Sequence, residues 1–156
     1  MKELRMVLKN DTPVLKQVLD SIDLFPSEML DDMIFDYLNN PNSSDIWFTE
    51  TENNVPISIG YCAPEKFAEG TWNIYAIGVR SDIQAKGTGS RMMNFIESHL
   101  KEKGERILIV ETSSSDDYNL TRSFYKKLGY TKEAVIRDFW EKDDDKVVFW
   151  KKLNSN

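Results

Sequence analysis

The chain has 156 residues, of which 40% are hydrophobic and 29% charged, and its net charge is −6 at pH 7. These values are typical of one globular domain, here residues 1–156, and they exclude a disordered chain. No apolar run approaches the roughly 20 residues that cross a bilayer, and the acidic balance argues against nucleic acid as a partner.

The first part of the chain predicts a short strand followed by two helices. Arg5 to Leu8 can form the strand. Thr12 followed by Pro13 is typical of an N-cap with proline at the first helical position. Apolar residues then recur at helical spacing as far as Ile22, and a second helix starts at Ser27 and ends at Asn39-Asn40-Pro41.

The rest of the chain alternates between strand and helix patterns. The order strand, helix, strand in its middle predicts a parallel crossover, whereas the hairpins predict antiparallel neighbours. We therefore expect an α/β fold: a mixed, mostly antiparallel sheet flanked by helices. The predicted strands are Ile46–Thr51, Val55–Ala63, Thr71–Arg80, Arg106–Thr112, Thr131–Asp138 and Lys146–Leu153, with helices around Met92–Leu100 and Leu120–Leu128.

The turn from Gln84 to Ser90 leaves a strand and opens a helix. A helix start presents unpaired backbone N–H groups and the positive end of the helix dipole, which suits an anion. Gly87 and Gly89 lack a Cβ, so a phosphate can approach the backbone closely. The pattern fits neither a Walker loop nor a Rossmann fingerprint, because the glycines and Lys86 stand at the wrong offsets. An ordinary strand-to-helix turn remains the alternative.

Two motifs together resemble the GCN5-related N-acetyltransferase (GNAT) family. Gln84-Ala85-Lys86-Gly87-Thr88-Gly89 is similar to its Gln/Arg-x-x-Gly-x-Gly/Ala pyrophosphate loop. The segment from Asn119 to Tyr130, with Phe124-Tyr125 and Gly129-Tyr130, resembles a later helix of that family. The resemblance implies the acyl-CoA N-acyltransferase fold, in which two central parallel strands splay apart and acetyl-CoA enters the gap.

The resemblance also implies the residues that contact acetyl-CoA, which would act as the acyl-donor co-substrate. Backbone groups of the strand before the loop would hold the pantetheine and thioester, and backbone amides of the loop would hold the pyrophosphate. Asn119 matches a family asparagine that contacts the cofactor, although asparagine also favours helix starts. The implied contacts are Ile77, Gly78, Val79, Gln84, Ala85, Lys86, Gly87, Thr88, Gly89, Ser90 and Asn119.

The expected reaction is attack of an amine on the thioester carbonyl. Tyr125 is the predicted general acid, because a phenol with a pKa near 10 is protonated at neutral pH and can donate to a departing thiolate. The alternative role for Tyr125 is that of a partly buried aromatic residue beside Phe124. Glu111 ends the buried strand at the expected gap and is a candidate base. It can equally bind the substrate ammonium or pair with a basic side chain, and a water relay is an alternative to it.

We expect the acceptor to be a primary amine on a small molecule or peptide. The family shapes its acceptor pocket with the first helical pair and the last strands, which here implies Phe25, Glu28 and Asp32, with Met29, Tyr37, Asp138, Phe139 and Trp140 around them. An acyl-CoA-binding module without catalysis, or an enzyme that uses another acyl-CoA, are the alternatives.

The remaining features of the sequence indicate the cellular compartment and the partners to expect. Cys62 is the single cysteine, which rules out an internal disulfide and fits a reducing compartment. The N-terminus lacks the apolar core of a signal peptide. We therefore expect a cytoplasmic protein with no metal and no membrane partner. Members of the family often dimerise, so a homodimer is compatible with the resemblance.

Overall fold

The structure is a computed structural model, and it describes residues 1–154. Its core is an eight-stranded sheet in the order β1-β2-β4-β5-β6-β8-β7, with the short β3 paired to β2. The strands are β1 (Lys2–Met6), β2 (Ile46–Glu52), β3 (Val55–Pro56), β4 (Ser58–Pro64), β5 (Thr71–Val79), β6 (Ile107–Ser113), β7 (Thr131–Glu141) and β8 (Asp144–Lys152).

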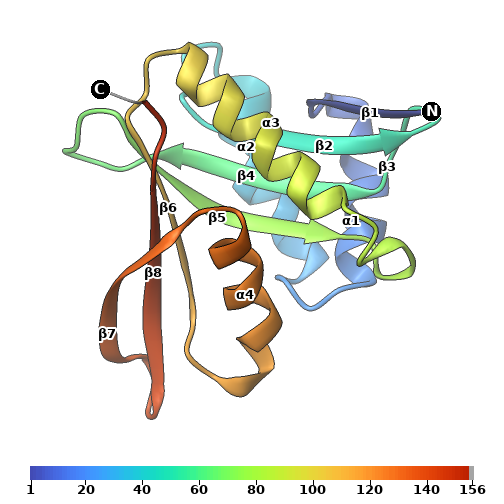
Figure 1. Cartoon of the computed structure of the whole chain (residues 1–156). Coiled ribbons are helices and arrows are strands. Elements are labelled where there is room, and N and C mark those ends of the chain that lie inside the picture. Colours follow the sequence, from blue (N-terminus) through green and yellow to red (C-terminus); the bar gives the residue numbers. More distant parts are fainter. Residues whose placement is uncertain (155–156) are drawn as a thin grey trace.

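The helices cover both faces of the sheet (Figure 1). Helices α1 (Thr12–Asp20) and α2 (Leu30–Asn39) bury their apolar stripes against one face, around Trp47 and Ile59. Helices α3 (Thr88–Glu102) and α4 (Asn119–Lys127) pack on the other face, against residues such as Phe48 and Phe149. The apolar periods of the sequence therefore correspond to the buried faces of the helices.

The middle of the sheet opens between β5 and β6. These strands pair in parallel from Thr71 opposite Ile107 to Ile74 opposite Val110, and the pairing ends there. Beyond this point β5 and β6 diverge, and α4 lies on the side to which they open (Figure 1). Every other adjacent pair in the sheet is antiparallel. The predicted mixed, mostly antiparallel sheet with splayed central parallel strands is confirmed.

A β-bulge lies on β5 at the point of divergence. Tyr61 pairs with Ala76 and Cys62 with Ile74, so that Tyr75 has no partner on β4. A bulge bends its strand and increases the local twist. The last residues of β5 are thereby turned away from β6, which holds the gap open.

Several element boundaries differ from those predicted. The first strand ends at Met6 rather than Leu8, because the backbone N–H of Leu8 donates to the Asp11 carboxylate at 2.7 Å and starts a 3₁₀ turn. Asp11, not Thr12, is accordingly the residue before α1. The predicted strand Val55–Ala63 is two strands, since Ile57 lies between β3 and β4. The second predicted helix begins as a 3₁₀ turn over Ser27–Met29.

Among the helices of residues 1–154, none combines the length and apolar character that crossing a membrane requires.

Candidate active site

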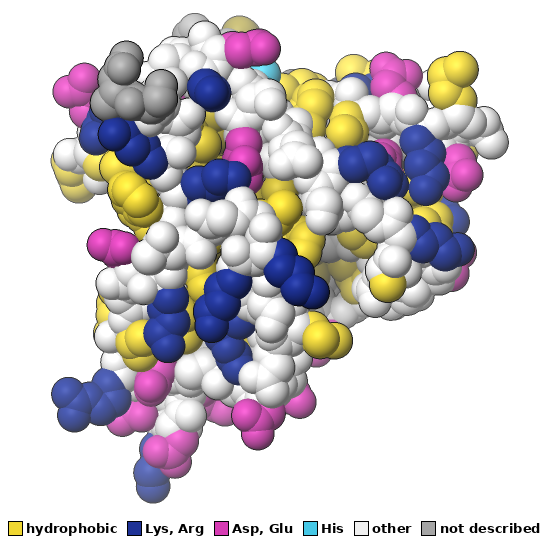
Figure 2. Space-filling model, viewed as in Figure 1, with side chains coloured by type: hydrophobic (Ala, Val, Ile, Leu, Met, Phe, Trp, Pro, Cys, Tyr) yellow, Lys and Arg dark blue, Asp and Glu magenta, His cyan; other side chains and the backbone are white. Residues whose placement is uncertain are grey.

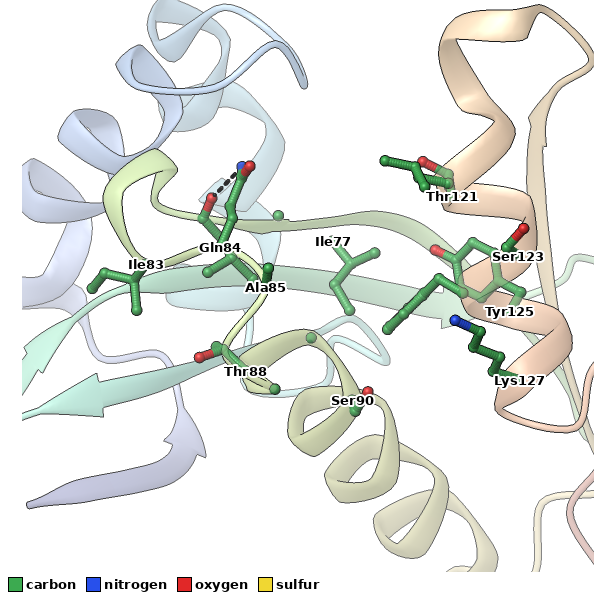
Figure 3. A pocket seen from close by; sticks show the side chains of 16 residues that line it. Ile77, Ile83, Gln84, Ala85, Thr88, Ser90, Thr121, Ser123, Tyr125 and Lys127 are labelled. Atoms are coloured by element: carbon green, nitrogen blue, oxygen red, sulfur yellow. Dashed lines mark hydrogen bonds between the residues drawn. The ribbon is translucent and has the colours of Figure 1, made fainter.

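A cavity of about 590 Å³ runs along the free edge of β5, over the start of α3 and against α4 (Figure 3). The space-filling view shows a notch between the part of the molecule that carries α4 and the part that carries α3 (Figure 2). The cavity is lined by Ile77, Gly78, Val79, Ile83, Gln84, Ala85, Gly87, Thr88, Gly89, Ser90, Leu120, Thr121, Ser123, Phe124, Tyr125 and Lys127.

The first turn of α3 forms one end of this cavity. Gly87 precedes the helix with a φ of 89°, a left-handed conformation that favours glycine. No side chain of residues 1–154 caps the helix start. The first backbone N–H groups of a helix have no partner within it, so Thr88, Gly89 and Ser90 present free donors and the positive end of the dipole. Lys127 extends its amino group from α4 towards the same space (Figure 3). This end of the cavity suits an anion.

The wall opposite α4 is the edge of β5. Residues 75–79 continue beyond the last pair with β6, so their backbone groups on that side are free of sheet hydrogen bonds. The Gln84 side chain donates to the Val79 carbonyl oxygen at 3.1 Å and fastens the loop to the end of the strand (Figure 3). An extended ligand with amide groups can therefore add to β5 as a strand would.

Tyr125 lies at the inner end of the cavity. Its ring is buried, with the side chain packed between Tyr130 and Phe149 at centroid distances of 5.7 Å. Its hydroxyl points towards Ile77 and the cavity, and it has no hydrogen-bond partner within residues 1–154 (Figure 3). Burial raises the pKa of Tyr125 above its ordinary value of 10, so the phenol stays protonated at neutral pH.

A smaller cavity of about 330 Å³ adjoins the first one at Tyr125, Thr121 and the end of β5. Two carboxylates line it: Asp23, from the loop after α1, and Glu111, the first residue of β6 beyond its pairing with β5. The two cavities therefore meet beside the Tyr125 phenol, and within the described residues only the smaller cavity is lined by carboxylates.

Glu111 forms an ion pair with Lys146, whose Nζ lies 2.7 Å from Oε2. The same amino group lies 4.1 Å from the centre of the Phe139 ring. The Trp140 indole donates to the carbonyl oxygen of Thr112, the residue after Glu111, at 3.2 Å. Strand β7 thus supports the position of Glu111 without lining the cavity.

Gly78 sets how closely the α1–α2 loop approaches β5. A Cβ built at Gly78 would lie 2.5 Å from Cδ1 of Ile22 and 3.2 Å from Cδ2 of Leu24. Both of these residues line the smaller cavity, next to Asp23. The absence of a side chain at Gly78 therefore lets this loop form a wall of the cavity.

Most of the predicted cofactor residues line the larger cavity together, but Lys86 and Asn119 do not. Lys86 is exposed, and Asn119 accepts a hydrogen bond from Arg122 at the start of α4. Neither cavity is lined by Phe25, Glu28 or Asp32: Phe25 packs against the α1–α2 core, and Glu28 and Asp32 are exposed.

The structure also brings in residues that the sequence pattern did not indicate. Ile22, Asp23 and Leu24 lie in the loop after α1, and their contribution depends on the path of this irregular loop. Thr121 and Ser123 of α4 also line the larger cavity. The spacing of Thr121 and Tyr125, four residues apart on one helix, was the available signal for Thr121.

A mixed sheet that opens between two parallel strands, with an uncapped helix start at the opening, is the architecture of the acetyltransferase class. Residues 12–130 match the profile of the family described as the acetyltransferase (GNAT) family. Because this match spans more than half of the chain, the protein belongs to the GNAT acetyltransferases.

Solved structures share this fold over nearly the whole chain. A protein from Desulfovibrio desulfuricans assigned to the GNAT family is 25% identical, with a TM-score of 0.88 over 99% of this chain and 100% of that one. The ribosomal-protein-S18-alanine N-acetyltransferase from Escherichia coli is 16% identical, with a TM-score of 0.80 over 100% and 96%. An aminoglycoside 6′-N-acetyltransferase complexed with coenzyme A is 17% identical, with a TM-score of 0.72 over 99% and 98%. The last two show likeness of fold alone. Among curated proteins, none matches the sequence.

Proposed function

We propose that residues 1–156 act as one catalytic domain that transfers the acetyl group of acetyl-CoA to a primary amine. The observation that carries this proposal is the position of the Tyr125 hydroxyl, unpaired within the described chain and directed into the cavity beside the free edge of β5. Coenzyme A in the related aminoglycoside acetyltransferase supports the choice of donor. The anion-suited start of α3 would take the pyrophosphate.

In the proposed reaction, the acceptor enters through the smaller cavity and its neutral amine attacks the thioester carbon. A C–N bond forms while the carbonyl π electrons move to oxygen, where a backbone N–H of Ile77 or Gly78 would stabilise the oxyanion. Collapse re-forms the carbonyl and breaks the C–S bond. The departing thiolate takes the proton of Tyr125, and the ammonium proton leaves to Glu111 or to water, from which Tyr125 regains its proton.

The smaller cavity favours a cationic acceptor. Asp23 and Glu111 are its acidic side chains, and the charge of Glu111 is partly balanced by Lys146. Asp23 would therefore attract the incoming ammonium, and Glu111 would receive its proton directly or through water. The two structurally similar enzymes are named for an aminoglycoside and for the alanine of a ribosomal protein. Both small amines and peptide N-termini are therefore candidate acceptors.

A panel assay tests this proposal and its alternatives. The protein is incubated with acetyl-CoA and with aminoglycosides, polyamines, or peptides with an N-terminal alanine, and released CoA thiol is measured beside the mass of the acetylated product. We expect equal amounts of CoA and N-acetyl product with at least one acceptor class. CoA binding by calorimetry without turnover on any amine would instead favour a binding module, and faster turnover with propionyl- or succinyl-CoA would reassign the donor.

A further inference from the structure

Arg91, in the first turn of α3, connects the predicted pyrophosphate loop to the sheet through Glu50 on β2. We infer that the Glu50–Arg91 ion pair is a positioning device that holds the loop in the conformation that binds the pyrophosphate of the donor. This inference rests on the proposed use of acetyl-CoA. Neither residue lines the larger cavity, so the pair would act through the loop and not by contact with the ligand.

The ion pair has two well-aligned hydrogen bonds. Arg91 Nε donates to Glu50 Oε1 at 2.6 Å, and Arg91 Nη2 donates to Oε2 at 3.0 Å. The side chain of Glu50 is 2% exposed, whereas that of Arg91 is 40% exposed. A two-pronged guanidinium–carboxylate contact fixes the orientation of both groups as well as their distance. Arg91 is thus held in one plane by a residue that cannot move without disturbing the core.

Glu50 itself is anchored by the sheet. Its backbone N–H donates to the hydroxyl of Ser58 at 2.7 Å, and it lies opposite Leu4 on the neighbouring strand. Burial alone would raise the pKa of Glu50, but the hydrogen bonds from Arg91 and Thr88 and the charge of Arg91 lower it below its ordinary value. Glu50 is therefore ionised at neutral pH, and the pair is intact under the conditions of the reaction.

From this anchor, Arg91 reaches both sides of Gly87. Its Nη1 donates to the carbonyl oxygen of Lys86 at 3.3 Å, and its Nη2 donates to the Thr88 hydroxyl at 3.1 Å. In a trans peptide the carbonyl and the following N–H point in opposite directions. Holding the Lys86 carbonyl towards Arg91 therefore directs the Gly87 N–H away from Arg91.

The close approach of the Arg91 guanidinium also leaves little room for a side chain at position 87, in addition to the positive φ of Gly87. A Cβ built there would lie 2.9 Å from Nη1 of Arg91. Gly87 thus leaves room for the Arg91 guanidinium on one side, while its backbone lines the larger cavity on the other. An ion pair with a buried carboxylate is a poor source of stability, because desolvation of the carboxylate offsets much of the attraction. Control of loop geometry gives this pair a function that an apolar pair of the same volume could not perform.

The test compares two donors that differ in the pyrophosphate. Glu50→Gln removes the charge of the carboxylate, and the double variant Glu50→Gln with Arg91→Gln removes both charges, so that no unpaired charge is left buried. For both variants we expect the calorimetric Kd for CoA and the KM for acetyl-CoA to rise on the order of tenfold, the size expected for losing charge-assisted hydrogen bonds. S-acetylpantetheine lacks the pyrophosphate, so its turnover should be unchanged.

Asp11→Asn is the matched control, because Arg5 binds Asp11 with two hydrogen bonds of 2.7 and 3.0 Å in a pair remote from both cavities. We expect it to lower the melting temperature and leave the Kd for CoA unchanged. If wild-type protein binds CoA and the Glu50 variants bind equally well, the inference is overturned while the proposed function stands. Equal losses with both donors would also overturn it, as a general structural effect. Wild-type protein that does not bind CoA would overturn the proposed function itself.

Discussion

At the scale of single residues, Tyr125 combines a buried ring with a hydroxyl directed into a cavity. The ring belongs to the core, with Phe124 at 5.2 Å and Tyr130 and Phe149 at 5.7 Å between centroids. Such packing leaves the phenol little freedom to rotate, so its oxygen is fixed relative to β5. A fixed donor is what a general acid requires, since proton transfer depends on hydrogen-bond geometry.

Replacing Tyr125 with phenylalanine should therefore lower kcat by about 10²-fold or more, with little change in the Kd for CoA. The melting temperature should change little, because the hydroxyl has no partner to lose within residues 1–154. Tyr130→Phe is the control: it removes a hydroxyl that donates to Glu97 at 2.7 Å, outside both cavities. That variant should lose about 1 kcal/mol of stability and keep its kcat. Equal kcat in wild-type and Tyr125→Phe protein would remove the acid from the mechanism.

The pH dependence of turnover follows from the same burial. Because the pKa of Tyr125 is raised above 10, its proton is present over the whole neutral range and into alkaline solution. Deprotonation of Tyr125 therefore cannot reduce kcat between about pH 7 and pH 9.5. We expect a kcat profile that is flat or rising over this interval, measured with saturating acceptor. A fall centred near pH 8 that disappears in Tyr125→Phe would contradict the account.

Asp23 and Asp32 should differ in their effect on acceptor binding, although the sequence gives no reason to distinguish them. Asp23 lines the smaller cavity and Asp32 is exposed on α2 outside it. Asp23→Asn should raise the KM for a cationic amine severalfold without changing that for acetyl-CoA, because it removes an attraction to the ammonium. Asp32→Asn should leave both KM values unchanged. Unchanged acceptor KM in Asp23→Asn would argue against electrostatic selection by this cavity.

At the scale of elements, the loop before α3 requires a left-handed residue and a close neighbour at the same position. Gly87→Ala would strain a φ of 89° and place a methyl group 2.9 Å from Arg91 Nη1. Gly104→Ala would strain a φ of 81° after α3, where no atom lies within 4 Å of the added carbon. Both variants should lose roughly 1–2 kcal/mol of stability from the backbone alone. Only Gly87→Ala should also raise the Kd for CoA, and calorimetry on the pair would show whether that difference exists.

The sequence predicts the helices and the strand order, but it does not predict the contacts between distant elements. Helices α1, α3 and α4 follow from apolar periodicity, and the order of the strands follows from their alternation with helices. The approach of Asp23 to the site does not follow, because the direction of a loop residue depends on tertiary contacts such as that of Ile22 with Gly78. The Glu50–Arg91 pair joins residues 41 apart in the chain, and no local pattern indicates such a contact.

At the scale of the whole molecule, the charge at the larger cavity is opposite in sign to the net charge of the chain. The chain is acidic overall, yet among residues 1–154 Lys127 is the only charged side chain that lines the larger cavity, beside the positive end of α3. The smaller cavity has Asp23 and Glu111 on its walls. An anionic donor and a cationic acceptor would thus be drawn to different sides of the opening between β5 and β6, with Tyr125 where the two meet.

A crystal structure of the CoA complex would show whether the opening between β5 and β6 binds the donor with its sulfur beside Tyr125. We predict the pyrophosphate on the backbone amides of residues 87–90, the pantetheine along β5 from residue 75 to 79, and the sulfur within hydrogen-bond distance of the Tyr125 hydroxyl. CoA bound outside the larger cavity, or bound there with its sulfur remote from Tyr125, would contradict the account.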